Sequence, residues 1–119
     1  MKPNIIKDKS KLFAIKMINL YKDLANNKKE YVISKQILRA GTSIGANINE
    51  AICSITKKEF LSKMYISYKE AYETQYWLEL LKYTNYINEC EFNSFNNDCN
   101  EIIRLLSSIT KSTRENLNI

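Results

Sequence analysis

Residues 56–83, TKKEFLSKMYISYKEAYETQYWLELLKY, carry the longest helical pattern of this chain. Thr56 and Glu59 have the spacing of a capping box, in which the threonine oxygen accepts an early backbone N–H and the glutamate reaches back to the cap. Apolar residues then recur in steps typical of one helix face, at Phe60, Met64, Tyr68, Ala71, Leu78 and Leu81. The pattern predicts a helix over 57–83, about 40 Å long at 1.5 Å per residue.

Three further stretches have a helical period and predict helices at about 9–26, 34–54 and 91–114. The first has its apolar face at Phe13, Met17, Leu20, Tyr21 and Leu24. The second has a stripe at Ile37, Ala40, Ile44, Ile48, Ala51 and Ile55. The last has a heptad pattern at Phe92, Phe95, Cys99, Ile102, Leu106, Ile109 and Thr113, before residues 115–119, which we expect to fray.

These elements predict an all-α protein, an antiparallel up-down-up-down four-helix bundle that forms a single domain over residues 1–119. Only two glycines and one proline occur in 119 residues, which argues against a β-sandwich or barrel with its many turns. The alternative is a three-helix core with the first helix loosely attached. We favour four helices because the first has an apolar face of its own.

The composition limits the classes of function. The formal charge of +5 and the pI near 9.1 are compatible with nucleic acid or another anionic partner, although a coding bias toward Lys, Asn, Ile and Tyr would give a similar surplus. No apolar run is long enough for a membrane span, and the first residues do not form a signal peptide. Three cysteines without a CxxC pair or any histidine indicate reduced thiols in the cytoplasm, not a disulfide framework or a zinc site.

The chain lacks the usual chemistry of enzymes. Without histidine it has neither a Ser-His-Asp nor a Cys-His pair, and no glycine-rich phosphate loop is present. We therefore expect no catalytic residue, no cofactor and no metal. Glu70 and Glu73 lie one turn apart, but a di-metal bundle needs Glu-x-x-His motifs. We expect one of them to pair with a cation such as Arg39, within or between subunits, and Trp77 to lie at a core edge or at a subunit interface.

Residues 39–51, RAGTSIGANINEA, contain two unusual features. Gly41 and Gly45 lie in a helix interior, where each costs roughly 1 kcal/mol relative to alanine, so we expect another helix to pack closely there, in the same bundle or in a neighbouring subunit. A polar stripe at the margin of the core is the second feature, and it predicts hydrogen bonds between helices; a ligand or nucleic-acid contact is the alternative. Its members are Arg39, Ser43, Asn47 and Glu50.

Residues 39–51 and 57–87, with LLSSITK at 105–111, resemble the four helix bundle protein family. That family includes the proteins encoded in intervening sequences of bacterial 23S rRNA genes and is similar to accessory proteins of diversity-generating retroelements. The resemblance implies a four-helix protomer that forms a ring-like homopentamer; the retroelement proteins bind a reverse transcriptase and nucleic acid, and most members have no known function. Gly45 is not diagnostic, and a reverse-transcriptase partner is not carried over. Positions matching the family signature are Arg39, Ser43, Asn47, Glu50, Glu70, Glu73 and Trp77.

Two hypotheses of function follow. In the first, the protein is a non-catalytic, oligomeric, basic adaptor that binds RNA or DNA, with or without a protein partner. The lysines and arginines that we expect to contact phosphate are Lys57, Lys58 and Lys63, with Lys111 and Arg114 as a second cluster. Tyrosines interleaved with lysines could stack on bases, although we favour an oligomer interface for most of them. In the second hypothesis, the chain is purely a protein-interacting assembly module without a nucleic-acid role.

Overall fold

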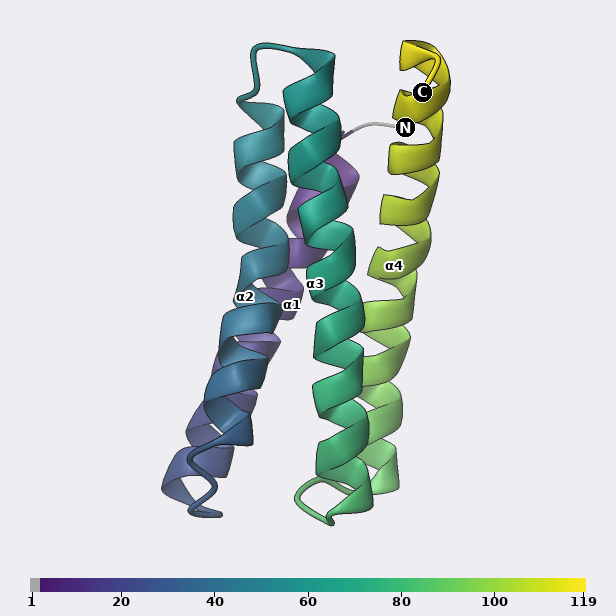
Figure 1. The fold of residues 1–119 in the computed structure, drawn as a ribbon. Coiled ribbons are helices and arrows are strands. Elements are labelled where there is room, and N and C mark those ends of the chain that lie inside the picture. Colours follow the sequence, from purple (N-terminus) through teal and green to yellow (C-terminus); the bar gives the residue numbers. More distant parts are fainter. Residues whose placement is uncertain (1–2) are drawn as a thin grey trace.

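The computed structural model describes residues 3–119, with side chains from residue 5 onward. It contains four α-helices, α1 (Pro3–Asn26), α2 (Ile33–Ile52), α3 (Lys57–Tyr83) and α4 (Glu89–Leu117), and no strand in the described residues. Each helix runs opposite to the one before it, and consecutive helices lie side by side (Figure 1). The predicted all-α bundle is confirmed.

Several helix ends differ from the sequence-based expectation. Helix α1 begins at Pro3, six residues before the predicted start, and proline is tolerated there because a first-turn residue needs no N–H partner. The prediction that Ile55 belongs to the apolar stripe of α2 is wrong, because α2 ends at Ile52 and Ile55 is 94% exposed in the connection to α3. Helix α4 continues to Leu117, and Asn118 closes it in the left-handed conformation.

The core runs along the bundle axis and receives apolar side chains from every helix. Helix α1 packs an apolar face into the core, where Ile6, Phe13, Met17 and Leu24 are almost completely buried. The alternative of a loosely attached first helix is therefore wrong. Helix α1 packs mainly along α2 and contacts α4 more sparsely. Other large side chains that are fully buried are Ile37, Ile44, Ile48, Met64, Leu78, Leu81, Ile102 and Leu106.

Polar side chains cap the N-termini of three helices, α2, α3 and α4. Thr56 Oγ1 accepts the N–H of Glu59 at 3.1 Å at the start of α3, while the reciprocal capping box occurs on α4, where Asn88 and Glu91 exchange both bonds.

The start of α2 is capped by Glu30, a buried residue outside the helix. Its carboxylate accepts the backbone N–H groups of Val32, Ile33 and Ser34 at 3.2, 3.1 and 2.6 Å. One side chain therefore satisfies three donors that a helix start leaves without partners.

Candidate functional site

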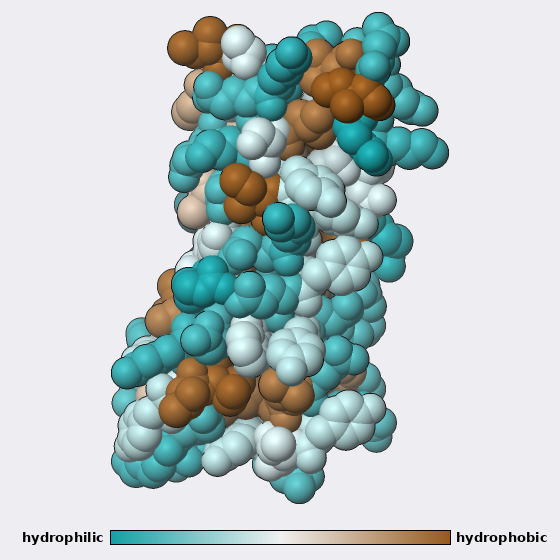
Figure 2. Space-filling model, in the orientation of Figure 1, coloured by the Kyte–Doolittle hydropathy of each residue, from teal (hydrophilic) through white to brown (hydrophobic). Residues whose placement is uncertain are grey.

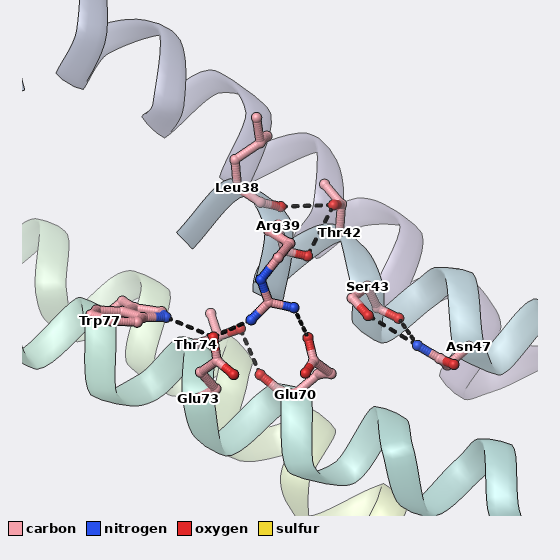
Figure 3. A network of polar contacts seen from close by, with 9 residues as sticks. All are labelled: Leu38, Arg39, Thr42, Ser43, Asn47, Glu70, Glu73, Thr74 and Trp77. Carbon is pink, nitrogen blue, oxygen red and sulfur yellow. Dashed lines mark hydrogen bonds and ion pairs between the residues drawn. The ribbon is translucent and has the colours of Figure 1, made fainter. Parts of the chain in front are cut away.

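A network of charged side chains joins α2 to α3 (Figure 3). Arg39 reaches from α2 across to α3, where Nη1 donates to Glu70 Oε2 at 2.8 Å and Nη2 donates to Glu73 Oε2. The Trp77 indole N–H donates to the same Glu73 oxygen at 3.0 Å. The arginine that sequence reasoning connected with these glutamates thus contacts both of them, and it does so within one chain.

The network shifts the pKa values of Glu73 and Arg39. Partial burial acts to raise the pKa of the Glu73 carboxyl, but the hydrogen bonds from Trp77 and Arg39 outweigh it and hold that pKa below its usual range. The hydrogen bond to Glu73 is the largest cause of the raised pKa of the Arg39 guanidinium. Arg39 and Glu73 therefore form a clamp that is charged near neutral pH, which is suited to fixing the register of two helices but not to exchanging protons.

The other members of the polar stripe on α2 have different partners. Asn47 Nδ2 donates to both the backbone oxygen and the hydroxyl of Ser43 at 2.9 Å, so these two residues bond along α2 and not across to α3. Figure 3 shows this pair further along α2, with no bond drawn to the Arg39 cluster. Glu50 makes a second bridge to α3, with its carboxylate 2.9 Å from Lys63 Nζ. The stripe therefore joins the helices at its two ends and bonds to itself in the middle.

The residues expected to contact phosphate lie at one end of the bundle. Lys57 and Lys58 begin α3, whereas Lys111 and Arg114 lie in the last turns of α4; these two termini lie at the same end of the bundle (Figure 1). All four side chains are exposed. Lys63 is different, because the hydrogen bond to Glu50 is the main cause of its raised pKa, and its charge is partly neutralised.

The starts of α1 and α3 and the ends of α2 and α4 together form what we name the basic end: residues 5–12, 48–64 and 108–119. These segments contain eight lysines and arginines against four acidic residues. The other described segments, 13–47 and 65–107, contain nine of each sign. Within that neutral sum, residues 13–47 contain six basic and two acidic residues, and residues 65–107 contain three and seven. The net positive charge of the described chain therefore lies at one end, which is a distribution that attracts an extended anion.

The tyrosines that the sequence interleaves with lysines lie mostly on the outer face of α3. Tyr65, Tyr72, Tyr76 and Tyr83 are exposed, and Lys69 Nζ lies 5.7 Å above the ring of Tyr65. Trp77 is half-buried against the core and packs edge-on against Tyr76 with 5.2 Å between ring centroids. The row of these tyrosines begins at Tyr65, directly after the part of α3 that belongs to the basic end, and runs along α3 away from that end.

Among residues 3–119, no three Cys, Asp or Glu side chains are grouped in a way that could hold a metal ion. Burial, with a smaller effect of Asp98, raises the pKa of the Cys99 thiol to about 12, so this cysteine is a buried apolar side chain in practice. None of the described helices has the length and apolar content required to cross a bilayer.

Comparisons with known proteins agree with the fold. Residues 2–108 match the protein family described as 23S rRNA-intervening sequence protein. Among solved structures, the chain is similar to the crystal structure of a protein with unknown function from the S23 ribosomal protein family of Bacteroides thetaiotaomicron VPI-5482. The two chains are 56% identical with a TM-score of 0.91, over 93% of this chain and 99% of the other. No curated protein matches the chain.

Proposed function

Because the chain belongs to the 23S rRNA-intervening sequence protein family, we propose that it is a non-catalytic, oligomeric adaptor that binds RNA or DNA through its basic end. The observation that carries this proposal is the separation of charge. The rest of the described chain is neutral in sum, so its net positive charge lies at the basic end, where it attracts the phosphate backbone. The four exposed cations Lys57, Lys58, Lys111 and Arg114 are the expected contacts, and Lys63 contributes less because of Glu50.

The binding should depend weakly on sequence. The cations of the basic end stand on helix termini and offer no groove-reading helix with several base-contacting side chains. Phosphate contacts position a protein on nucleic acid without identifying bases. We therefore propose a nucleic-acid partner with exposed backbone phosphates. We also propose that the protein acts as an adaptor in the cytoplasm, where the three unpaired cysteines stay reduced.

We further propose that the protein acts as a homo-oligomer, with the pentamer that the family resemblance implies as the expected size. Apolar side chains exposed on α1 support self-association, because a monomer gains nothing from placing them in water. Leu12 is 63% exposed, and together with Ile15 it lines a shallow groove between α1 and α4. The groove is bordered by ion pairs of Lys9 with Glu101 and of Lys16 with Asp98. Several copies would also multiply the number of basic ends available to one nucleic acid.

The proposal is tested by fluorescence anisotropy with short single-stranded RNA, single-stranded DNA and duplex DNA across a salt series. We expect binding to all three, weakening steeply with salt, with a slope of log affinity on log salt near −0.9 per phosphate neutralised on the duplex. The absence of binding even at low salt would contradict the adaptor role and favour the alternative of a purely protein-interacting assembly module.

A further inference from the structure

The outer face of α3 presents one straight row of side chains to solvent. Tyr65 and Tyr83 are 18 residues apart, which is five full turns at 3.6 residues per turn, so they lie on one line along the helix. Tyr72 and Tyr76 lie within about 20° of that line on the same helical geometry. The four rings are 48%, 49%, 53% and 76% exposed for Tyr65, Tyr72, Tyr76 and Tyr83. Figure 2 shows pale aromatic side chains following one another down the face over α3.

Two charged residues complete this row. Lys69 and Glu79 are exposed, and neither forms an ion pair within the described chain. With the tyrosines they give steps of four, three, four, three and four residues, which is the spacing of the a and d positions of a coiled coil. We name this row the outer seam: Tyr65, Lys69, Tyr72, Tyr76, Glu79 and Tyr83. The core face of α3 lies on the opposite side of the helix. Helix α3 therefore has two seams, and only the core-facing one packs against the other helices of the same chain.

The outer seam is complementary to itself when it is reversed. Read from either end, tyrosine is opposite tyrosine, and Lys69 is opposite Glu79, because every such pair has its midpoint at residue 74. We propose that α3 pairs antiparallel with α3 of a second copy of this chain, about a two-fold axis that crosses the outer face of α3 level with residue 74. In a two-fold contact, any residue that meets a partner is met in return. Lys69 then meets the partner's Glu79, while Glu79 meets the partner's Lys69.

The chemistry of the seam favours a second copy over nucleic acid. Tyrosines are enriched at protein interfaces, where they bury apolar area and still satisfy their hydroxyls. Glu79 lies between Tyr76 and Tyr83, where it would repel phosphate, and only the reversed copy provides each charge with an opposite one. This surface differs from the groove on α1, and it extends along α3 away from the basic end. Because a two-fold contact cannot join neighbouring protomers of a five-membered ring, the pairing joins protomers of different rings, and it needs no nucleic acid.

The area is sufficient for a weak, specific contact. The exposed half of a tyrosine amounts to about 100 Å², so the seam and its margins would bury roughly 600 Å² per copy, near the lower end of specific interfaces. We therefore expect reversible association that increases with concentration.

Sedimentation velocity over a concentration series tests the pairing with four variants. Lys69→Glu and Glu79→Lys each replace two attractive pairs with two repulsive ones, and each should weaken the doubling of mass at least about tenfold. The double variant, Lys69→Glu with Glu79→Lys, restores opposite charges and should associate like the wild type. Lys22→Glu, an exposed α1 substitution with the same change of charge, should have no effect.

Mixing is the sharpest test. Equal amounts of Lys69→Glu and Glu79→Lys should associate with each other more strongly than either does alone, since both cross-pairs are then opposite in charge. Each of three results would overturn the proposal. The wild-type protein never doubles in mass, the single variants associate like the wild type, or the mixture associates no more strongly than either variant alone. If Glu79→Lys instead leaves self-association unchanged and tightens binding of single-stranded RNA, the row is a stacking surface for nucleic acid and the pairing is refuted.

Discussion

Gly41 on α2 faces Met17 on α1 so closely that a β-carbon added to Gly41 would lie 2.4 Å from Met17 Cγ and 2.9 Å from Met17 Cβ. These atoms belong to the base of the methionine side chain, which cannot move without displacing the helix or the buried core. We expect Gly41→Ala to lower the free energy of unfolding by about 1–3 kcal/mol, because overpacking outweighs the better helix propensity of alanine. Urea denaturation followed by circular dichroism measures the change.

Gly45 provides the matched control for that substitution. A β-carbon there would have its nearest neighbours, the hydroxyl and carbonyl oxygens of Ser10, at 3.4 and 3.5 Å, which is ordinary contact. We expect Gly45→Ala to be neutral or to stabilise the protein by up to about 1 kcal/mol through helix propensity. If both substitutions had the same effect, close packing of α1 on α2 would not be the reason for Gly41.

The clamp between Arg39 and Glu73 should make stability depend on pH. The pKa of Glu73 is lower in the folded than in the unfolded chain, so its contribution is fully present above the unfolded pKa, near 4.5, and is lost as pH falls through the folded pKa. Glu73→Gln should therefore destabilise by about 0.5–1.5 kcal/mol at pH 7, a modest value because Arg39 is half-exposed to solvent screening. The difference from the wild type should shrink below about pH 4.

Urea titrations at pH 7 and pH 3.5 make this comparison. Glu115→Gln removes an exposed carboxylate on α4 that forms no ion pair in the described chain, and it should change stability by less than about 0.5 kcal/mol at either pH. A constant deficit of Glu73→Gln across the pH range would show that lost packing and not the charge causes the effect.

Most of the fold could be predicted from helical spacing, because apolar residues three and four apart identify the buried face of each helix even when its neighbours are not known. The spacing of Glu70 and Glu73 placed both on one face, but only the structure could show that Arg39 of the same chain reaches them. The basic end was not predictable as a unit, since its cations come from three separate helices whose termini meet only in the folded chain. Glu30 was missed because capping patterns feature a Ser, Thr, Asp or Asn directly before the helix.

Removal of the Glu30 carboxylate should weaken the start of α2. Glu30→Ala leaves three backbone N–H groups without their acceptor, one of them, that of Ser34, in a buried position, and we expect a loss of about 1–3 kcal/mol of unfolding free energy. Glu30→Gln keeps one acceptor oxygen and should lose less. Hydrogen exchange should show the amides of residues 32–34 exposed before the rest of α2, and unchanged protection there would contradict a capping role.

The three cysteines should differ in reactivity. Cys53 and Cys90 are exposed, whereas Cys99 is fully buried with its pKa raised to about 12, and its Sγ donates to the backbone oxygen of Ala71 at 3.2 Å. Because the thiolate is the reactive form, a disulfide reagent at pH 8 should label two thiols rapidly in the native protein and the third only after unfolding. Cys99→Ala should remove the slow thiol, and three fast thiols in the native wild type would contradict this assignment.

Lys57 and Lys58 should carry a measurable share of nucleic-acid binding. Both are exposed at the start of α3 and neither forms an ion pair in the described chain, so each is free to neutralise a phosphate. We expect Lys57→Ala with Lys58→Ala to weaken duplex binding uniformly across sequences and to lower the salt slope by about two units. The matched control is Lys22→Ala with Lys35→Ala, which removes the same charge from exposed positions outside the basic end. An equal loss in both double variants would mean that total charge, and not the basic end, governs binding, because a localised site loses contacts only when its own cations are removed.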